Sequence, residues 1–282
     1  MTAPAVPPRR AFVREVDQAS EQVDLAGAAL LIAKEEYPQL SIERHLGRLD
    51  QLAEEVRDRL GNEGAPLIVF QELLHTLYQR NGFRGNREAY YDPRNSLLSD
   101  VLDQRKGIPL TLGIIVLEVG WRLGLPLEGV NFPGHFLVRF PGTTIRLLVD
   151  PFDTGRIWFE EQAQELLDRV YGGMVRVRPR FLKPAGKREM LVRLLANLKG
   201  IYLNVQDNDR ALAAIERILV IHPTAAGQIR DRGTLLARMG RADEALAQLQ
   251  WYLDYAPEAS DARQIRSLVE ELRAPGSRDQ GR

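Results

Sequence analysis

Two residues of this chain, His135 and Asp150, have types and spacing that suggest chemistry. They stand at the start and the end of two short segments of extended pattern, His135 to Phe140 and Thr144 to Asp150. A two-residue turn with glycine first, Gly142-Thr143, suits the twist of a hairpin and would place His135 directly opposite Asp150. The same register builds one apolar face from three pairs, Phe136 with Val149, Val138 with Leu147 and Phe140 with Ile145.

Opposed residues on neighbouring strands have Cβ atoms about 4.5–5.5 Å apart, so an imidazole there can hydrogen-bond a carboxylate. Such a bond would fix the tautomer of His135 and leave its other ring nitrogen free to act as a base. An ordinary polar pair at the end of a sheet explains the two residues about equally well. Gly134 before the histidine and Pro151 after the aspartate slightly favour a shaped pocket.

A nucleophile to accompany this pair is missing. The chain has no cysteine, which excludes disulfides, thiolate metal sites and a cysteine nucleophile. A cysteine opening the helix predicted over Leu110 to Leu123 would be activated by the positive end of that helix. Pro109 stands there instead, where its missing N–H costs nothing, and it has no reactive atom. The nearest hydroxyls, on Ser99 and Thr111, lack an identifiable activating base.

The elements that must position the pair are mostly helical, and the expected fold class is α+β with a small antiparallel sheet. Apolar residues recur at helical spacing from Phe12 to Arg80, and a short helix is expected up to Asp103. The loop between them contains Tyr91 and Asp92, which, with Thr111, are candidates to line the pocket of the histidine. Packing of the loop explains its two residues equally well.

The segment from Tyr171 to Arg193 is locally basic and contains the alternating run Val175 to Arg178. We interpret it as a solvated connector with an edge strand, in preference to a binding patch.

The last third of the chain contains an internal repeat of 34 residues. Five positions of the first unit correspond to positions 34 residues later in the second. They are Tyr202 with Leu236, Ala211 with Ala245, Ile215 with Leu249, Ile218 with Tyr252, and Pro223 with Pro257. Helix pairs of this period, with alanine at the tight crossing and proline after the second helix, are typical of tetratricopeptide (TPR) repeats. Gly233 fits the packing glycine of the second unit, whereas the first unit has Lys199. A closing helix is expected over Ser260 to Arg273.

The charge balance is even, with 38 Lys and Arg against 38 Asp and Glu, which disfavours general nucleic-acid binding. The longest uncharged apolar stretch, Gly107 to Leu117, is far short of the roughly 20 residues of a membrane-spanning helix. Residues 1–11 are Pro-rich and are expected to form a disordered arm and no signal peptide, and residues 274–282 a flexible tail. We therefore expect a cytoplasmic protein that binds neither nucleic acid nor membrane. No motif predicts a cofactor or a metal site.

The segment RKGIPLTLGIIVLEVGWRLGLPLEGVNFPGHFLVRF, with LLVDPF after it, resembles the transglutaminase-like (papain-like) fold. Together with YYDPRNSLLSDVLDQRKGIP, ALLIAKEEYP and the repeats, it resembles the bacterial SirB family of transglutaminase-like proteins from about Asp24 to Arg273. The resemblance implies that His135 and Asp150 match the His and Asp of the family, and that the cysteine position of active transglutaminases falls at Pro109. It implies a transglutaminase-like domain over residues 12–182, TPR-like repeats over 188–273, and no cofactor.

The leading hypothesis is a non-catalytic regulator, a pseudoenzyme that binds a protein or peptide in the groove of its repeats. The alternative is a divergent amide- or ester-bond hydrolase or transferase, with His135 as base, Asp150 as its orienter, and water or Thr111 as nucleophile. In a third interpretation the pair only fixes the hairpin. The sequence leaves open which of these holds, who the partner is, and what the oligomeric state is.

Overall fold

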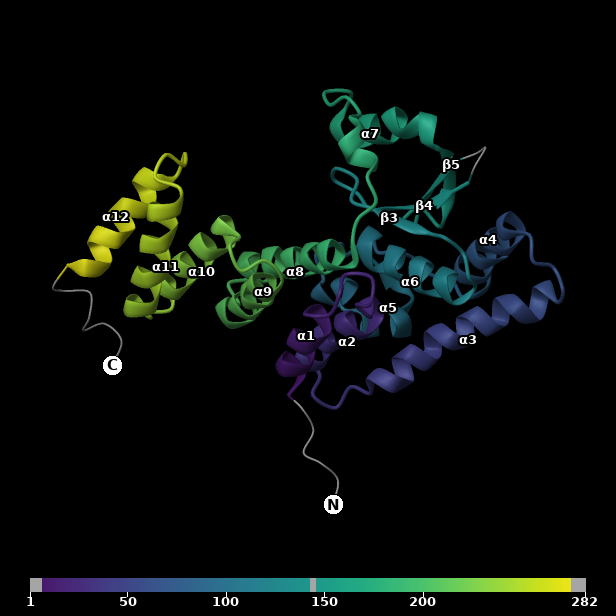
Figure 1. Ribbon diagram of the computed structural model, residues 1–282, viewed down its shortest axis with the longest axis horizontal. Coiled ribbons are helices and arrows are strands. Elements are labelled where there is room, and N and C mark those ends of the chain that lie inside the picture. The colour runs from purple at the N-terminus through teal and green to yellow at the C-terminus, as the bar shows by residue number, and fades with distance from the viewer. Residues whose placement is uncertain (1–6, 143–145, 275–282) are drawn as a thin grey trace, which may run out of the picture. The chain divides into compact units, whose positions relative to one another are not determined.

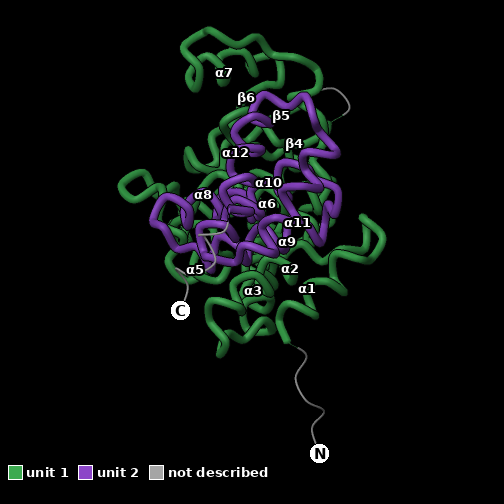
Figure 2. Tube along the Cα trace, turned by 90° about the vertical axis from the view of Figure 1, so that its left-hand side faces the viewer, with its two compact units in different colours: residues 1–194 green, residues 195–282 purple. Residues whose placement is uncertain are grey.

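The computed structural model describes residues 7–142 and 146–274. The chain divides into two compact units, Met1–Leu194 and Leu195–Arg282 (Figure 2). The division falls within helix α8, Lys187–Asn204, whereas the sequence placed the start of the repeats at residue 188. Each unit is described by itself below.

Unit 1 begins with helices that pack around a buried apolar core. Its helical segments are α1 Pro8–Val16, α2 Leu25–Glu36, α3 Ile42–Leu60, α4 Pro66–Leu74, the π-helical turn η1 His75–Arg80, η2 Pro93–Ser96, α5 Leu98–Gln104, α6 Pro109–Arg122, η3 Glu160–Gln162, α7 Ala163–Tyr171 and η4 Pro179–Leu182. The prediction of a disordered arm over residues 1–11 is wrong for the last of these residues, because Pro8 starts α1 and Phe12 is fully buried. Residues 1–6 and 275–282 lie outside the described residues.

Helix α6 is the buried centre of unit 1, and it forms where the sequence predicts it. Pro109 occupies its first position, and Gly124, at φ +75°, follows its end. Thr111 caps the first turn, since its hydroxyl oxygen accepts from the N–H of Ile108 at 3.2 Å. The helix approaches strand β4 closely, because a Cβ on Gly113 would lie 2.4 Å from Phe136 Cδ1.

A four-stranded antiparallel sheet packs between α6 and α7 (Figure 1). Its strands, in spatial order, are β3 Glu128–Val130, β4 Leu137–Pro141, β5 Arg146–Asp150 and β6 Arg156–Phe159. The face of the sheet that packs against α7 contributes Leu137, Leu148 and Trp158 to one cluster of buried side chains. Two further short strands, β1 Arg84–Gly85 and β2 Lys106–Gly107, pair in parallel.

The predicted hairpin register is wrong by two residues. Val138 pairs with Val149 and Phe140 with Leu147, so four residues, not two, separate the last pair, Pro141 and Arg146. Thr143 of the predicted turn and Ile145 lie outside the described residues. Because side chains alternate with a period of two, the shift leaves each one on the face assigned to it.

The edge strand predicted over Val175 to Arg178 is also wrong. A side chain takes the place of a neighbouring strand here. The amide of Gln164 accepts from the N–H of Val177 at 2.9 Å and donates to the carbonyl of Val175 at 3.0 Å. The two valines thereby cover the cluster beneath α7 without joining the sheet.

Unit 2 consists of helix pairs spaced as the 34-residue period predicts. Its helices are the end of α8, then α9 Asn208–Ile221, α10 Ala226–Arg238, α11 Ala242–Tyr255 and α12 Ala262–Arg273. Gly233 allows α10 and α11 to cross closely, since a Cβ there would lie 2.7 Å from Leu249 Cδ2. Lys199, at the corresponding position of the first pair, extends its ammonium to Asp231 and Gln228 of α10, both at 2.9 Å.

No helix in the described part of the chain has the length and apolar character needed to cross a membrane.

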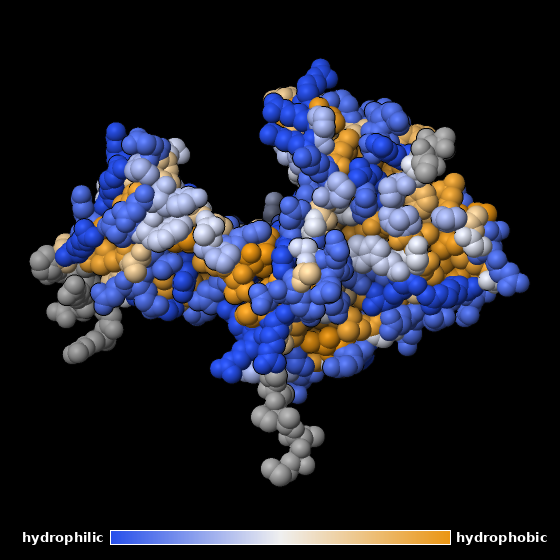
Figure 3. Space-filling view, in the orientation of Figure 1, coloured by the Kyte–Doolittle hydropathy of each residue, from blue (hydrophilic) through white to orange (hydrophobic). Residues whose placement is uncertain are grey.

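In Figure 3 hydrophobic surface gathers over the end of unit 1 that contains α4. Leu67 and Ile68 of α4 are 42% and 43% exposed.

Candidate functional site

A tight turn presents His135 at the entrance to β4. The N–H of His135 donates to the carbonyl of Phe132 at 3.0 Å, which closes a four-residue turn. Pro133 and Gly134 occupy its centre, and Gly134 has φ +67°, the combination that a type II turn requires. A Cβ on Gly134 would lie 2.7 Å from Val170 Cγ1, so α7 packs directly against this turn.

A second turn holds Asp150 at the end of β5. Its Oδ1 accepts from the N–H groups of Phe152 at 2.9 Å and of Asp153 at 3.1 Å. Pro151 lies between Asp150 and Phe152. It suits this local arrangement, in which an aspartate side chain caps the turn that follows it. Because β4 and β5 are antiparallel, the start of one lies beside the end of the other, and the two turns meet there.

The meeting of these turns produces the predicted pair, although through a different register. His135 Nε2 lies 2.8 Å from Asp150 Oδ1, and the two side chains are 16% and 13% exposed. A carboxylate can only accept, so Nε2 carries the proton and Nδ1 has the free lone pair of the neutral ring. Nδ1 makes no hydrogen bond to any described residue.

The surroundings of Asp150 favour its charged form. Burial alone would raise the pKa of its carboxyl, but the hydrogen bond and charge of His135 and the two backbone donors outweigh burial and lower this pKa. Tyr78 lies buried beneath the same loop, where burial and the nearby Asp150 charge raise the pKa of its phenol. Its ring fills the space against Gly155, where a Cβ would lie 2.4 Å from Cε2.

The pair opens into a small pocket of about 180 Å³. Its lining residues are Arg87, Phe132, His135, Asp150, Phe152, Asp153, Leu166, Arg169 and Val170. The ring centroid of Phe152 lies 6.3 Å from that of His135, and the Arg87 guanidinium lies over the Phe152 ring, 5.0 Å from its centroid. Within the described chain no three His, Asp or Glu side chains lie close enough to share a metal ion.

The structure does not bring the other predicted pocket residues to this site. Tyr91 is 75% exposed, and Asp92 caps η2 and pairs with Arg94 at 2.6 Å. Thr111 is fully buried, and its hydroxyl donates to the carbonyl of Asn95 at 2.7 Å. That bond and the capping role occupy the hydroxyl, so Thr111 is unsuited to be a nucleophile.

Sequence reasoning missed Arg87, Phe152 and Arg169. Phe152 follows Asp150-Pro151, so the turn itself was a signal that its ring would stand near the aspartate. Arg87 comes from the loop after β1, and Arg169 lies on an exposed face of α7. Nothing in their local sequence distinguishes these arginines from the many others on the surface.

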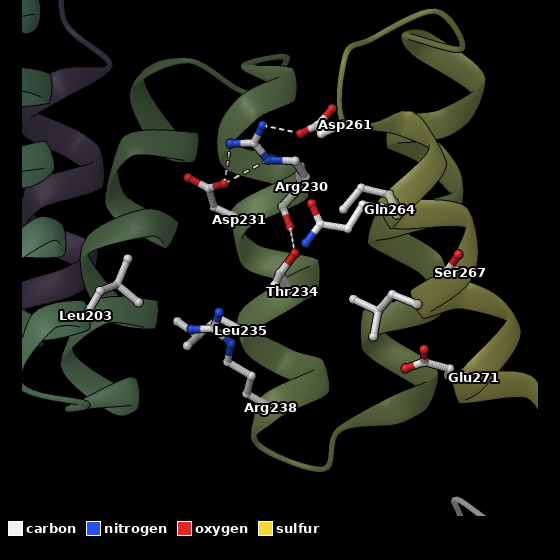
Figure 4. A pocket seen from close by; sticks show the side chains of 12 residues that line it. Leu203, Arg230, Asp231, Thr234, Leu235, Arg238, Asp261, Gln264, Ser267 and Glu271 are labelled. Atoms are coloured by element: carbon white, nitrogen blue, oxygen red, sulfur yellow. Dashed lines mark hydrogen bonds and ion pairs between the residues drawn. The ribbon is translucent and has the colours of Figure 1, made fainter.

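Unit 2 contains a separate groove of about 500 Å³ formed by side chains from α8, α10 and α12 (Figure 4). Leu203, Leu235, Ile265 and Leu268 supply its apolar surface. Arg230 bridges Asp231 at 2.6 Å and Asp261 at 2.5 Å, as the dashed lines in Figure 4 show. Arg238 lines the same groove and forms no ion pair with any described residue.

Comparisons with known proteins agree with this architecture. A model of the transglutaminase-like superfamily matches residues 43–196, and a tetratricopeptide repeat model matches residues 198–270. A UPF0162 protein of Xylella fastidiosa is 36% identical over 89% of this chain and 91% of its own length. A UPF0162 protein of Pseudomonas aeruginosa is 31% identical over 92% and 95%. Protein SirB1 of Salmonella typhimurium is 27% identical over 84% and 87%.

No solved structure matches the chain. The superfamily model nevertheless covers more than half of its residues, and the first relative spans nearly the whole of it. The predicted family and the α+β fold class, with TPR repeats after the first domain, are thereby confirmed. The chain belongs to the transglutaminase-like superfamily, among its SirB-like, TPR-containing proteins.

Proposed function

We propose that this protein is a non-catalytic, cytoplasmic regulator that binds a peptide segment of a partner protein in the groove of unit 2. The observation that supports the absence of catalysis is the lining of the His135 pocket. None of its nine described residues is Ser, Thr, Cys or Lys. Covalent catalysis by a hydroxyl, thiol or amine needs such a nucleophile, and the position that the family resemblance assigns to the cysteine is occupied by Pro109.

The shape and chemistry of the groove support peptide binding. TPR helices stack so that the first helix of each pair faces the concave side, where extended peptides bind. The groove in unit 2 is lined by α8, α10 and α12, which are the first helices of the two pairs and the closing helix. Its apolar leucines and isoleucine can bury side chains of a peptide, and Arg238 offers a charge for an acidic residue.

Replacing Arg238 by glutamate tests this proposal. Peptides selected on the wild-type full chain from a random display library should bind the Arg238→Glu variant about tenfold or more weakly, because an attraction becomes a repulsion. Fluorescence polarisation with the labelled peptides measures the affinity. The matched control is Arg263→Glu, an exposed α12 residue outside the groove. Equal affinities of both variants and the wild type would overturn the proposal.

A second candidate function is the divergent hydrolase, and one observation favours it. The free Nδ1 of His135, with Nε2 held by Asp150, is the arrangement of a general base that could activate water. This candidate requires turnover that is lost in His135→Ala.

A further inference from the structure

A pair of like charges stands side by side on the two-stranded sheet of unit 1. Arg84 of β1 and Lys106 of β2 are register partners. Lys106 makes no side-chain hydrogen bond or ion pair with any described residue, and Arg84 donates only to the carbonyl of Gly82, at 3.3 Å. The like charges of the two side chains repel each other, and an anion bound between or beside them would remove this repulsion.

These cations line a pocket of about 320 Å³ to which Arg87 also contributes. The pocket has two acidic residues, Asp153 and Glu88. Asp153 is already engaged by Arg87 at 3.1 Å and by Arg156 at 3.8 Å, while Glu88 is exposed and without an ion pair among the described residues. Three cations against two acids leave the lining with a net positive charge.

One residue of the same pocket has a strained backbone. Thr154, at φ +51°, lines the pocket. Arg105, at φ +59°, directly precedes Lys106, and its left-handed conformation ends helix α5. For a β-branched residue such as Thr154 this conformation is a genuine outlier, and strain of this kind gathers at ligand sites.

The pocket continues into that of His135. Arg87, Phe152 and Asp153 line both, so the two pockets adjoin at these three residues. The ring rests directly on β1, since a Cβ on Gly85 would lie 2.5 Å from Phe152 Cδ2. A ligand held in one pocket can therefore extend its remainder across Phe152 towards the other pocket.

We propose that the pocket formed by Arg84, Arg87 and Lys106 binds an oxyanion, the phosphate or carboxylate group of a ligand whose remainder crosses Phe152 towards His135. The like-charged strand pair, the unbalanced lining and the strained Thr154 are independent of the groove in unit 2. This site therefore stands or falls separately from the peptide binding proposed above.

Backbone amide NMR titrations of the full chain test the proposal. The probes are sodium phosphate and sodium citrate, each compared with sodium chloride at equal ionic strength. We expect saturable shifts of the Gly85, Lys106 and Gly107 amides with phosphate, citrate or both. Shifts with phosphate alone identify a phosphoryl group, and shifts with citrate alone identify a carboxylate. Shifts no different from those in chloride would overturn the proposal.

The Arg84→Gln/Lys106→Gln variant should bind the active probe about a hundredfold more weakly, roughly tenfold for each charge-assisted contact removed. The matched control is Arg44→Gln/Arg263→Gln, which removes two exposed arginines that make no described side-chain contact and so changes the net charge equally. Lys106→Arg keeps the charge and should still bind, which separates loss of the site from loss of folding. Equal weakening in the control would mean that net charge alone attracts the probe, and would overturn the proposal.

Discussion

Replacing Asp150 by alanine should lower the free energy of unfolding of unit 1 by about 3 kcal/mol. One carboxylate oxygen accepts from His135 Nε2 and from two backbone N–H groups, and its side chain is only 13% exposed. The variant leaves these donors without their acceptor in a half-closed pocket. Urea unfolding, followed by the fluorescence of Trp121 and Trp158 in a Trp251→Phe background, measures the loss.

The same carboxylate makes part of this stability depend on pH. Its pKa is lower in the folded chain than in the unfolded chain, so the contribution is fully present above the unfolded value of about 4. It is lost as the pH falls through the folded value. The stability difference between wild type and Asp150→Ala should therefore be larger at pH 7 than at pH 3.

Two control variants make this prediction specific to Asp150. Asp153→Ala removes a carboxylate that is 39% exposed and should cost about 0.5 kcal/mol. His135→Ala removes one of three donors and should cost about 1 kcal/mol. If Asp150→Ala cost no more than Asp153→Ala, Asp150 would not be the residue that anchors the two turns.

Alanine at Gly113 should destabilise unit 1 by about 2 kcal/mol, although alanine is the better helix former. The added Cβ would lie 2.4 Å from Phe136 Cδ1 and 3.5 Å from Pro151 Cγ. Phe136 is fully buried, so its ring has no open space to enter. The overlap would push α6 away from the residues next to His135 and Asp150.

Gly47 provides the opposite case in the same unit. It lies within α3, and a Cβ there would meet nothing within 4 Å. Gly47→Ala should therefore raise the free energy of unfolding by about 0.5–1 kcal/mol. The same urea experiment compares both variants. A stabilising Gly113→Ala would contradict the close packing of α6 on β4.

The structure and the comparisons confirm those parts of the fold that short segments encode. Pro109 and Gly124 delimit α6, and the 34-residue spacing defines the repeats. The pair of His135 and Asp150 was expected for a partly incorrect reason. Its partners meet because two local turns, Phe132 to His135 and Asp150 to Asp153, face each other, and the connection between the strands is longer than expected.

Features formed by distant segments could not be predicted. Arg87 lies more than sixty residues before Phe152, and no periodic pattern links the loop of β1 to the turn after β5. The prediction of an edge strand near Val175 was wrong for a related reason. An alternating pattern does not reveal that Gln164, from α7, will occupy the hydrogen bonds that a neighbouring strand would have used.

We propose that the protein binds a partner without transforming it. Wild type and His135→Ala should be used as baits for the same cell lysate, and the bound proteins analysed by intact-protein mass spectrometry. We expect the same partner with the same, unmodified mass on both baits. A partner that His135→Ala retains, but that the wild type releases with an altered mass, would contradict the claim and identify a hydrolase or transferase.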